Sequence, residues 1–222
     1  MTKARVLHPC LDENGNPVVL EHPSTSTDAA SWLDATAAAV ASRSDAPPLP
    51  TTLNGLAFNP HFLATPDERP EPWLRLAPNI VADEPDFVMP PGYRATSGCV
   101  VIEPDRRVWV VYPSNQFGGV VCTFPKGRLE PILSLAQNAA KETWEESGLY
   151  VEPTHFLCDI VRTHVVTRFY CARRLDGSPA LAGWESQAVG LAPFEKLSKI
   201  INREYDRRVL AYLEAFFQAH FD

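Results

Sequence analysis

The sequence lacks several patterns that would assign a function directly. Among its 222 residues there is no lysine- or arginine-rich block, and the formal net charge is −7. A scaffold for a nucleic-acid duplex is therefore not expected. No apolar run is long enough to cross a bilayer, and the residues after Met1 do not resemble a signal peptide. We expect a cytoplasmic protein with no membrane partner.

Cysteine is also scarce, and its few residues are not arranged for metal binding. The cysteines show no C-x-x-C spacing, their number is odd, and several lie in apolar runs. This pattern favours buried free thiols in a reducing compartment over disulfides or a zinc site. The residues concerned are Cys10, Cys99, Cys122, Cys158 and Cys171.

The first 97 residues differ in composition from the rest of the chain, because they contain most of the 21 prolines. Asn14-Gly15, between two apolar runs, predicts a β-hairpin. Asp28 is expected to cap an alanine-rich helix that continues to about Ser42. Residues 46–71 are expected to form ordered loop or linker rather than regular elements. Trp73 and the apolar residues after it should pack on the remainder of the chain.

We assign residues 1–95 to an accessory segment and residues 96–222 to a second unit. Three roles remain open for the accessory segment: covering the second unit, shaping a substrate pocket, or mediating dimerisation. In the second unit β-rich runs and helical patterns alternate, which indicates an α+β fold. The expected strands are residues 97–102, 108–112, 120–124, 155–162, 165–172 and 188–191; the expected helices are residues 134–147, a helix opened by Pro193, and residues 204–219.

The helix expected at residues 134–147 has clear start and stop signals. Ser134 is a favourable N-cap, and Gln137 three residues later completes a capping box. Gly148 lies where helices commonly end in a left-handed residue. The capping residues therefore predict both the start and the end of the helix at residues 134–147.

The same helix carries three carboxylates on one face: Glu142, Glu145 and Glu146, at positions i, i+3 and i+4. Like charges at this spacing repel, and they lie near the helix C-terminus, where the backbone dipole is already negative. A divalent cation would resolve the repulsion, since Mg²⁺ binds carboxylate oxygens while keeping water and phosphate as further ligands. The alternative is a solvated acidic helix end with no bound ion.

The stretch from Gly127 to Leu149 resembles the Nudix box, a pattern written G-x5-E-x7-R-E-U-x-E-E-x-G-U with U aliphatic. The matching positions are Gly127, Glu142, Glu145, Glu146, Gly148 and Leu149. Three positions depart from the pattern: Leu133 replaces the first Glu, Lys141 replaces Arg, and Thr143 replaces the aliphatic residue. If the missing carboxylate limits activity, Leu133→Glu should raise turnover.

The resemblance implies a Nudix-type α/β/α sandwich with a mixed β-sheet, preceded here by the proline-rich N-terminal extension. It also implies hydrolysis of a pyrophosphate bond in a nucleoside diphosphate linked to another moiety, with Mg²⁺ or Mn²⁺ as cofactor. Glu142, Glu145, Glu146 and the carbonyl of Lys126 are then the expected metal ligands. Glu145 is also the first candidate for the group that accepts the proton of the attacking water.

Several residues outside the box are weaker candidates for the site. Glu185 can serve as a base or an additional metal ligand, or it is a surface carboxylate. Trp184 and Tyr170 can stack on a nucleobase, although core packing is the alternative for each. Arg128 and Arg168 can pair with phosphate, with ordinary surface roles as the alternative.

Three functions are consistent with these residues. The first is an active hydrolase of ADP-ribose, a diadenosine polyphosphate or a nucleotide sugar. The second, motivated by Leu133 and Lys141, is a catalytically impaired Nudix-fold nucleotide sensor or regulator. The third is an interaction protein whose proline-rich segment binds a partner. A small-molecule nucleotide is the expected ligand for the first two, and a homodimer is one option for the assembly.

Overall fold

The computed structural model describes residues 5–59 and 69–221, and within them two β-sheets form the centre of the molecule. The first sheet has the order β8-β6-β10-β9, and it is mixed because β6 and β10 run parallel while the other pairs are antiparallel. The second sheet is antiparallel, with the order β3-β11-β7. The strands are β3 (Ala39–Ser42), β6 (Arg94–Val101), β7 (Arg107–Pro113), β8 (Lys126–Arg128), β9 (Leu149–Arg162), β10 (Val165–Gly177) and β11 (Ser186–Pro193).

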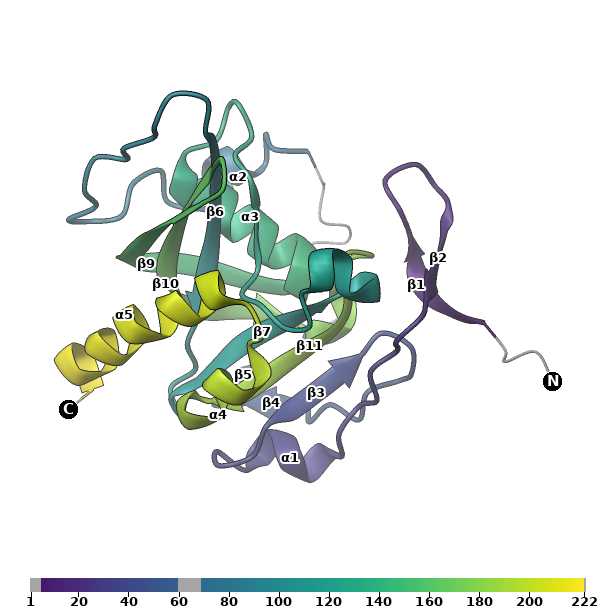
Figure 1. Cartoon of the computed structure of the whole chain (residues 1–222). Helices are drawn as coiled ribbons and strands as arrows, with labels where there is room; N and C mark the ends of the chain where they lie inside the picture. Colours follow the sequence, from purple (N-terminus) through teal and green to yellow (C-terminus); the bar gives the residue numbers. More distant parts are fainter. Residues whose placement is uncertain (1–4, 60–68, 222) are drawn as a thin grey trace.

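Helices cover these sheets from two sides, which confirms the predicted α+β class (Figure 1). The helix α3 (Leu135–Ser147) packs on the first sheet within one apolar core, where Trp144 lies with Trp109. The helices α4 (Phe194–Ile200) and α5 (Glu204–Phe221) enclose a separate apolar core, which includes Leu213 and Phe169. The predicted mixed sheet is present, and β7 and β11 belong to the separate second sheet.

The boundaries of α3 follow the local signals in the sequence. The hydroxyl of Ser134 accepts a hydrogen bond from the backbone of Gln137, whose side chain in turn accepts from the backbone of Ser134. Gly148 ends the helix in the left-handed conformation, with φ of 69°. A side chain there would also collide with the carbonyl of Ser178. The capping box and the glycine stop are thus confirmed.

Two predicted elements are wrong. The helix expected from Asp28 to Ser42 is α1 (Ala29–Leu33) alone, and the chain then becomes β3. It stops because Asp34 turns the backbone by accepting from Thr36, while β11 offers an edge with which β3 pairs. Alanine propensity is overridden by this tertiary pairing. The strand expected at residues 120–124 is reduced to an isolated bridge between Val111 and Thr123.

The predicted N-terminal hairpin is confirmed as β1 (Val6–Leu11) and β2 (Pro17–Leu20), with Gly15 at φ of 77° in the turn. It stands out from the rest of the molecule in Figure 1. The stretch expected as loop holds two short strands, β4 (Thr52–Leu53) and β5 (Leu56–Ala57), and residues 60–68 of that expectation lie outside the described part. The helix α2 (Trp73–Leu76) follows, and Trp73 is buried as expected.

Three buried arginines tie the irregular N-terminal residues to the sheets. Arg107 donates to the carbonyls of residues 31, 32 and 34 at the end of α1. Arg174 pairs with the buried Glu103 at 2.6 Å and donates to the carbonyl of Leu53. Arg168 pairs with Glu84 and donates to two carbonyls that follow it. Irregular backbone leaves carbonyls unpaired, and the five donors of a guanidinium satisfy several at once.

Two expectations about the whole chain can be compared with the structure. All five cysteines are free thiols, and all except the half-buried Cys10 are buried. Across the described residues, no helix combines the length and the apolar character required to cross a bilayer.

Candidate active site

Two carboxylates of α3, those of Glu142 and Glu146, face the strand β8, which precedes the helix. Glu142 lies directly over the α-carbon of Gly127, so that any side chain at this position would overlap its carboxylate. Glu146 accepts a hydrogen bond of 3.0 Å from the backbone N–H of Lys126, in β8. The absence of a side chain at Gly127 therefore leaves the space that Glu142 occupies, and the backbone N–H of Lys126 orients Glu146.

Glu145 points to a different neighbour. Both of its oxygens lie 2.7 Å from the Nζ atom of the buried Lys141. A further carboxylate, Glu130, lies 3.9 Å from the same Nζ atom. Glu130 was not predicted, because it lies inside the box at a position where the pattern specifies no residue. The available signal was a lysine predicted inside an amphipathic helix, which needs an anionic partner if it is buried.

The structure brings Glu185 to the same site. It is exposed, and its charge is near enough to raise the pKa of both Glu142 and Glu146. The loop that carries it is joined to α3 by a hydrogen bond of 2.7 Å from the N–H of Gly183 to the carbonyl of Glu145. Four carboxylates from two segments far apart in sequence therefore form one electrostatic cluster: Glu142, Glu145, Glu146 and Glu185.

Burial and mutual repulsion shift the protonation of this cluster. The pKa of Glu142 is raised to about 9, first by burial and then by the charges of Glu145 and Glu146. The pKa of Glu146 is raised to about 8, again mainly by burial, although the charge of Lys126 opposes the shift. Removing a carboxylate from water disfavours its ionised form, and neighbouring negative charges act in the same direction. Both groups are therefore mainly protonated at pH 7 in the absence of a cation.

The chemistry of the donors fits a hard divalent cation, because carboxylate oxygens are the ligands that Mg²⁺ and Mn²⁺ prefer. Among the causes of the pKa shift at Glu142, only the charge of Lys141 favours the ionised form, so a cation would find a carboxylate with little positive charge beside it. The oxygens are not gathered at one point: over residues 5–59 and 69–221, no three acidic, histidine or cysteine side chains are grouped to hold an ion. Glu145 would have to turn from Lys141 toward its neighbours to complete such a group.

The residues predicted to bind substrate differ in their exposure to solvent. Arg128 is exposed on β8, and Trp184 is half-buried beside Glu185. Arg168 is buried and paired with Asp159 and Glu84. Tyr170 is buried, with its hydroxyl donating to Glu84 at 2.7 Å. In this conformation Arg168 and Tyr170 serve internal partners, so we retain only Arg128 and Trp184 as candidates for substrate contact.

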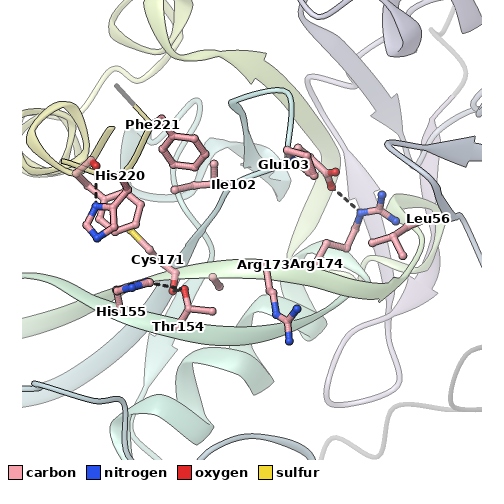
Figure 2. Close-up of a pocket in the computed structure, with 13 residues that line it drawn as sticks. Leu56, Ile102, Glu103, Thr154, His155, Cys171, Arg173, Arg174, His220 and Phe221 are labelled. Carbon is pink, nitrogen blue, oxygen red and sulfur yellow. Dashed lines mark hydrogen bonds and ion pairs between the residues drawn. The ribbon is translucent and has the colours of Figure 1, made fainter. Parts of the chain in front are cut away.

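A separate cavity of about 430 Å³ lies between α5 and the strands β9 and β10 (Figure 2). Its polar groups are partnered within the protein: Arg174 pairs with Glu103, and a ring nitrogen of His220 lies 2.9 Å from the carbonyl of Phe216. None of the four clustered carboxylates lines it. The cavity is therefore distinct from the carboxylate site.

The structure alters one expectation about the box. Leu133 is buried in the core around α3, with only 6% of its surface exposed. A carboxylate at this position would lie among apolar side chains. Meanwhile Glu130 already supplies a negative charge beside Lys141.

We therefore expect Leu133→Glu to destabilise the protein by about 2–4 kcal/mol, because it loses apolar packing and buries a group that prefers water. Urea unfolding measures the change. Leu133→Met is the matched control, since similar apolar volume costs less than about 1.5 kcal/mol. A rise in turnover at unchanged stability would contradict this prediction and restore the earlier one.

A mixed sheet covered by a helix with clustered carboxylates, next to a glycine-containing loop, is the arrangement expected of a Nudix domain. A family model described as "NUDIX domain" matches residues 92–213, which is more than half of the chain. The protein belongs to the Nudix family of hydrolases. A search of curated proteins found no match.

Several solved structures are similar to this chain at low sequence identity. A NUDIX hydrolase from Nitrosomonas europaea is 23% identical, with 64% of this chain and 81% of that chain covered and a TM-score of 0.49. An ADP-ribose pyrophosphatase from Streptococcus suis is 19% identical, with coverage of 58% and 92% and a TM-score of 0.47. An Ap4A hydrolase from C. elegans is 17% identical, with coverage of 57% and 98% and a TM-score of 0.46.

Proposed function

We propose that this protein hydrolyses a pyrophosphate bond in a nucleoside diphosphate linked to another moiety, with Mg²⁺ or Mn²⁺ as cofactor. The observation that carries the proposal is the cluster of four carboxylates, two of which have strongly raised pKa values. Perturbed titratable groups gathered at one place are typical of functional sites. Glu142, Glu145 and Glu146 are half-buried, which a purely structural acidic helix end would not require.

Glu142, Glu145 and Glu146 are the proposed ligands, together with the main-chain carbonyl of Lys126. When bound, a divalent cation neutralises charge on the diphosphate and lowers the pKa of water. The residues of the protein would supply the group that accepts the proton of the attacking water. In the reaction a water oxygen bonds to phosphorus, the bridging P–O bond breaks, and a proton is left for a carboxylate to accept.

Two carboxylates are suited to accept that proton. Glu145 pairs with Lys141 at 2.7 Å and would have to leave that ion pair to hold a cation or accept the proton. Glu185 is exposed and lies on a different segment, in the loop that Gly183 joins to the carbonyl of Glu145. Trp184, next to it, offers an aromatic face to a nucleobase, and exposed Arg128 offers a positive charge to a phosphate.

The test is a chromatographic panel that separates each substrate from its nucleotide products, with ADP-ribose, diadenosine tetraphosphate and a UDP-sugar, each with Mg²⁺, Mn²⁺ or excess chelator. Turnover of at least one substrate that disappears with chelator is expected. The absence of turnover on every substrate and metal would refute the proposed activity.

A second function is favoured by one observation: Glu145 is engaged by Lys141 rather than turned toward the other carboxylates. A protein that kept this ion pair when a nucleotide bound would act as a sensor rather than an enzyme. Calorimetry separates the two, because binding of an intact nucleotide without turnover supports the sensor.

A further inference from the structure

The loop at residues 182–185 joins the 3-10 turn η2 (Pro179–Leu181) to β11 and carries Trp184 and Glu185. On its inner side it packs tightly on α3. The N–H of Gly183 donates to the carbonyl of Glu145, and a Cβ atom at residue 183 would lie 2.8 Å from that oxygen. The position of Glu185 relative to the helix carboxylates therefore depends on how firmly this loop is held.

A second segment holds the loop from the side. Ser114, in η1 (Ser114–Gly119), donates its backbone N–H to the carbonyl of Glu185 at 2.7 Å and its hydroxyl to that of Trp184 at 2.6 Å. The next residue, Asn115, bonds to β2 and the residue after it: its amide donates to the carbonyl of Val19 and accepts from the N–H of Glu21. The N-terminal hairpin is thus connected to the loop through two consecutive residues.

Through His8 the hairpin also contacts Ser186, the first residue of β11, which directly follows the loop. The side chain of His8 is 5% exposed although it comes from a hairpin that stands out from the molecule. Its Nδ1 atom accepts from the N–H of Cys10 at 3.0 Å, so Nε2 carries the hydrogen and donates to the carbonyl of Ser186 at 3.1 Å. Burial lowers the pKa of His8 below its usual range, which keeps the ring neutral at pH 7. The thiol of Cys10 lies 3.9 Å from the carbonyl of Ala182.

We propose that the β1–β2 hairpin is a positioning element that holds the loop at residues 182–185 and the adjoining Ser186 against the carboxylate helix, with His8 as its main contact. Isolated two-stranded hairpins are marginally stable, so hairpin and loop are expected to order each other. Leu7 and Leu11 on the same hairpin are more than half exposed, whereas Leu20 and His8 are buried. The catalytic consequence rests on the role that the proposed function gives to Glu185 and Trp184.

Hydrogen exchange tests the physical part without requiring activity. His8→Ala removes the bond to Ser186, and we expect about fivefold faster exchange at the amides of Gly183 and Ser186, with α3 unchanged. His8→Gln keeps an N–H donor near the position of Nε2 and should restore slow exchange. Leu11→Ala, on the exposed side of the same strand, is the matched control. Unchanged exchange in His8→Ala would overturn the proposal.

Kinetics test the positional part. His8→Ala should lower kcat about tenfold, because small displacements of reacting groups are costly. In the Glu185→Gln background the same substitution should have little further effect, since both changes act through one carboxylate. Full additivity of the two would overturn the proposal. Lack of turnover by the wild-type protein would refute the proposed function instead, and the exchange rates would still decide whether the hairpin holds the loop.

Discussion

Glu145→Gln is expected to lower metal-dependent turnover at least about a hundredfold, in line with the usual contribution of a general base or an essential ligand. The substitution preserves size but removes the negative charge that pairs with Lys141 at 2.7 Å. It therefore removes one proposed ligand and one proposed proton acceptor without opening a cavity. Steady-state kinetics on the best substrate, with saturating Mg²⁺ or Mn²⁺, measures the loss.

Glu152→Gln provides the matched control for this experiment. Glu152 pairs with Arg173 on the surface, outside the carboxylate cluster, and surface pairs of this kind contribute at most about 1 kcal/mol. Its turnover should equal that of the wild-type protein. Equal rates in Glu145→Gln and wild type would remove Glu145 from the site. A parallel urea titration establishes that any loss of rate occurs in a folded protein.

The second large effect concerns metal affinity and pH. The carboxyls of Glu142 and Glu146, with pKa values raised to about 9 and about 8, must lose their protons before they bind a cation. Each required deprotonation strengthens binding about tenfold per pH unit below the pKa. We therefore expect Mn²⁺ to bind at least about tenfold more tightly at pH 8 than at pH 7, with proton release. Calorimetry in two buffers of different ionisation enthalpy measures both quantities.

The same shifts determine how the metal-free protein responds to pH. Each pKa is higher in the folded chain than its ordinary value of 4.5, so the folded state binds more protons in between. The stabilising contribution is complete below about pH 4.5 and is lost as the pH rises through about 8 and 9. Saturating Mn²⁺ should remove this loss. Metal affinity that is independent of pH, or a Glu142→Gln variant that releases as many protons as wild type, would contradict the assignment.

The N-terminal segment is part of the packed structure. Trp32 and Trp73 enter the core beside α3, and β3 extends the sheet that contains β11. The buried side chains of Arg107, Arg168 and Arg174 satisfy its irregular backbone. The boundary proposed at residue 95 stays a prediction, as do dimerisation and a cytoplasmic location.

Local pattern was sufficient for the elements whose signals are short in range. The capping box at Ser134, the glycine stop at Gly148 and the hairpin turn at Gly15 all depend on neighbours within a few residues. The shared face of Glu142, Glu145 and Glu146 follows from helical geometry alone. These features could be read before any fold was known.

Other features depend on partners distant in the chain, and sequence spacing cannot reveal them. Alanine-rich residues 39–42 became a strand because β11 was available for pairing. Arg168 faces inward because Glu84 and Asp159 neutralise it there. Glu130 meets Lys141, and His8 meets Ser186, only once the sheets have formed. Burial and long-range charge thus decided which polar residues are exposed for chemistry and which hold the fold together.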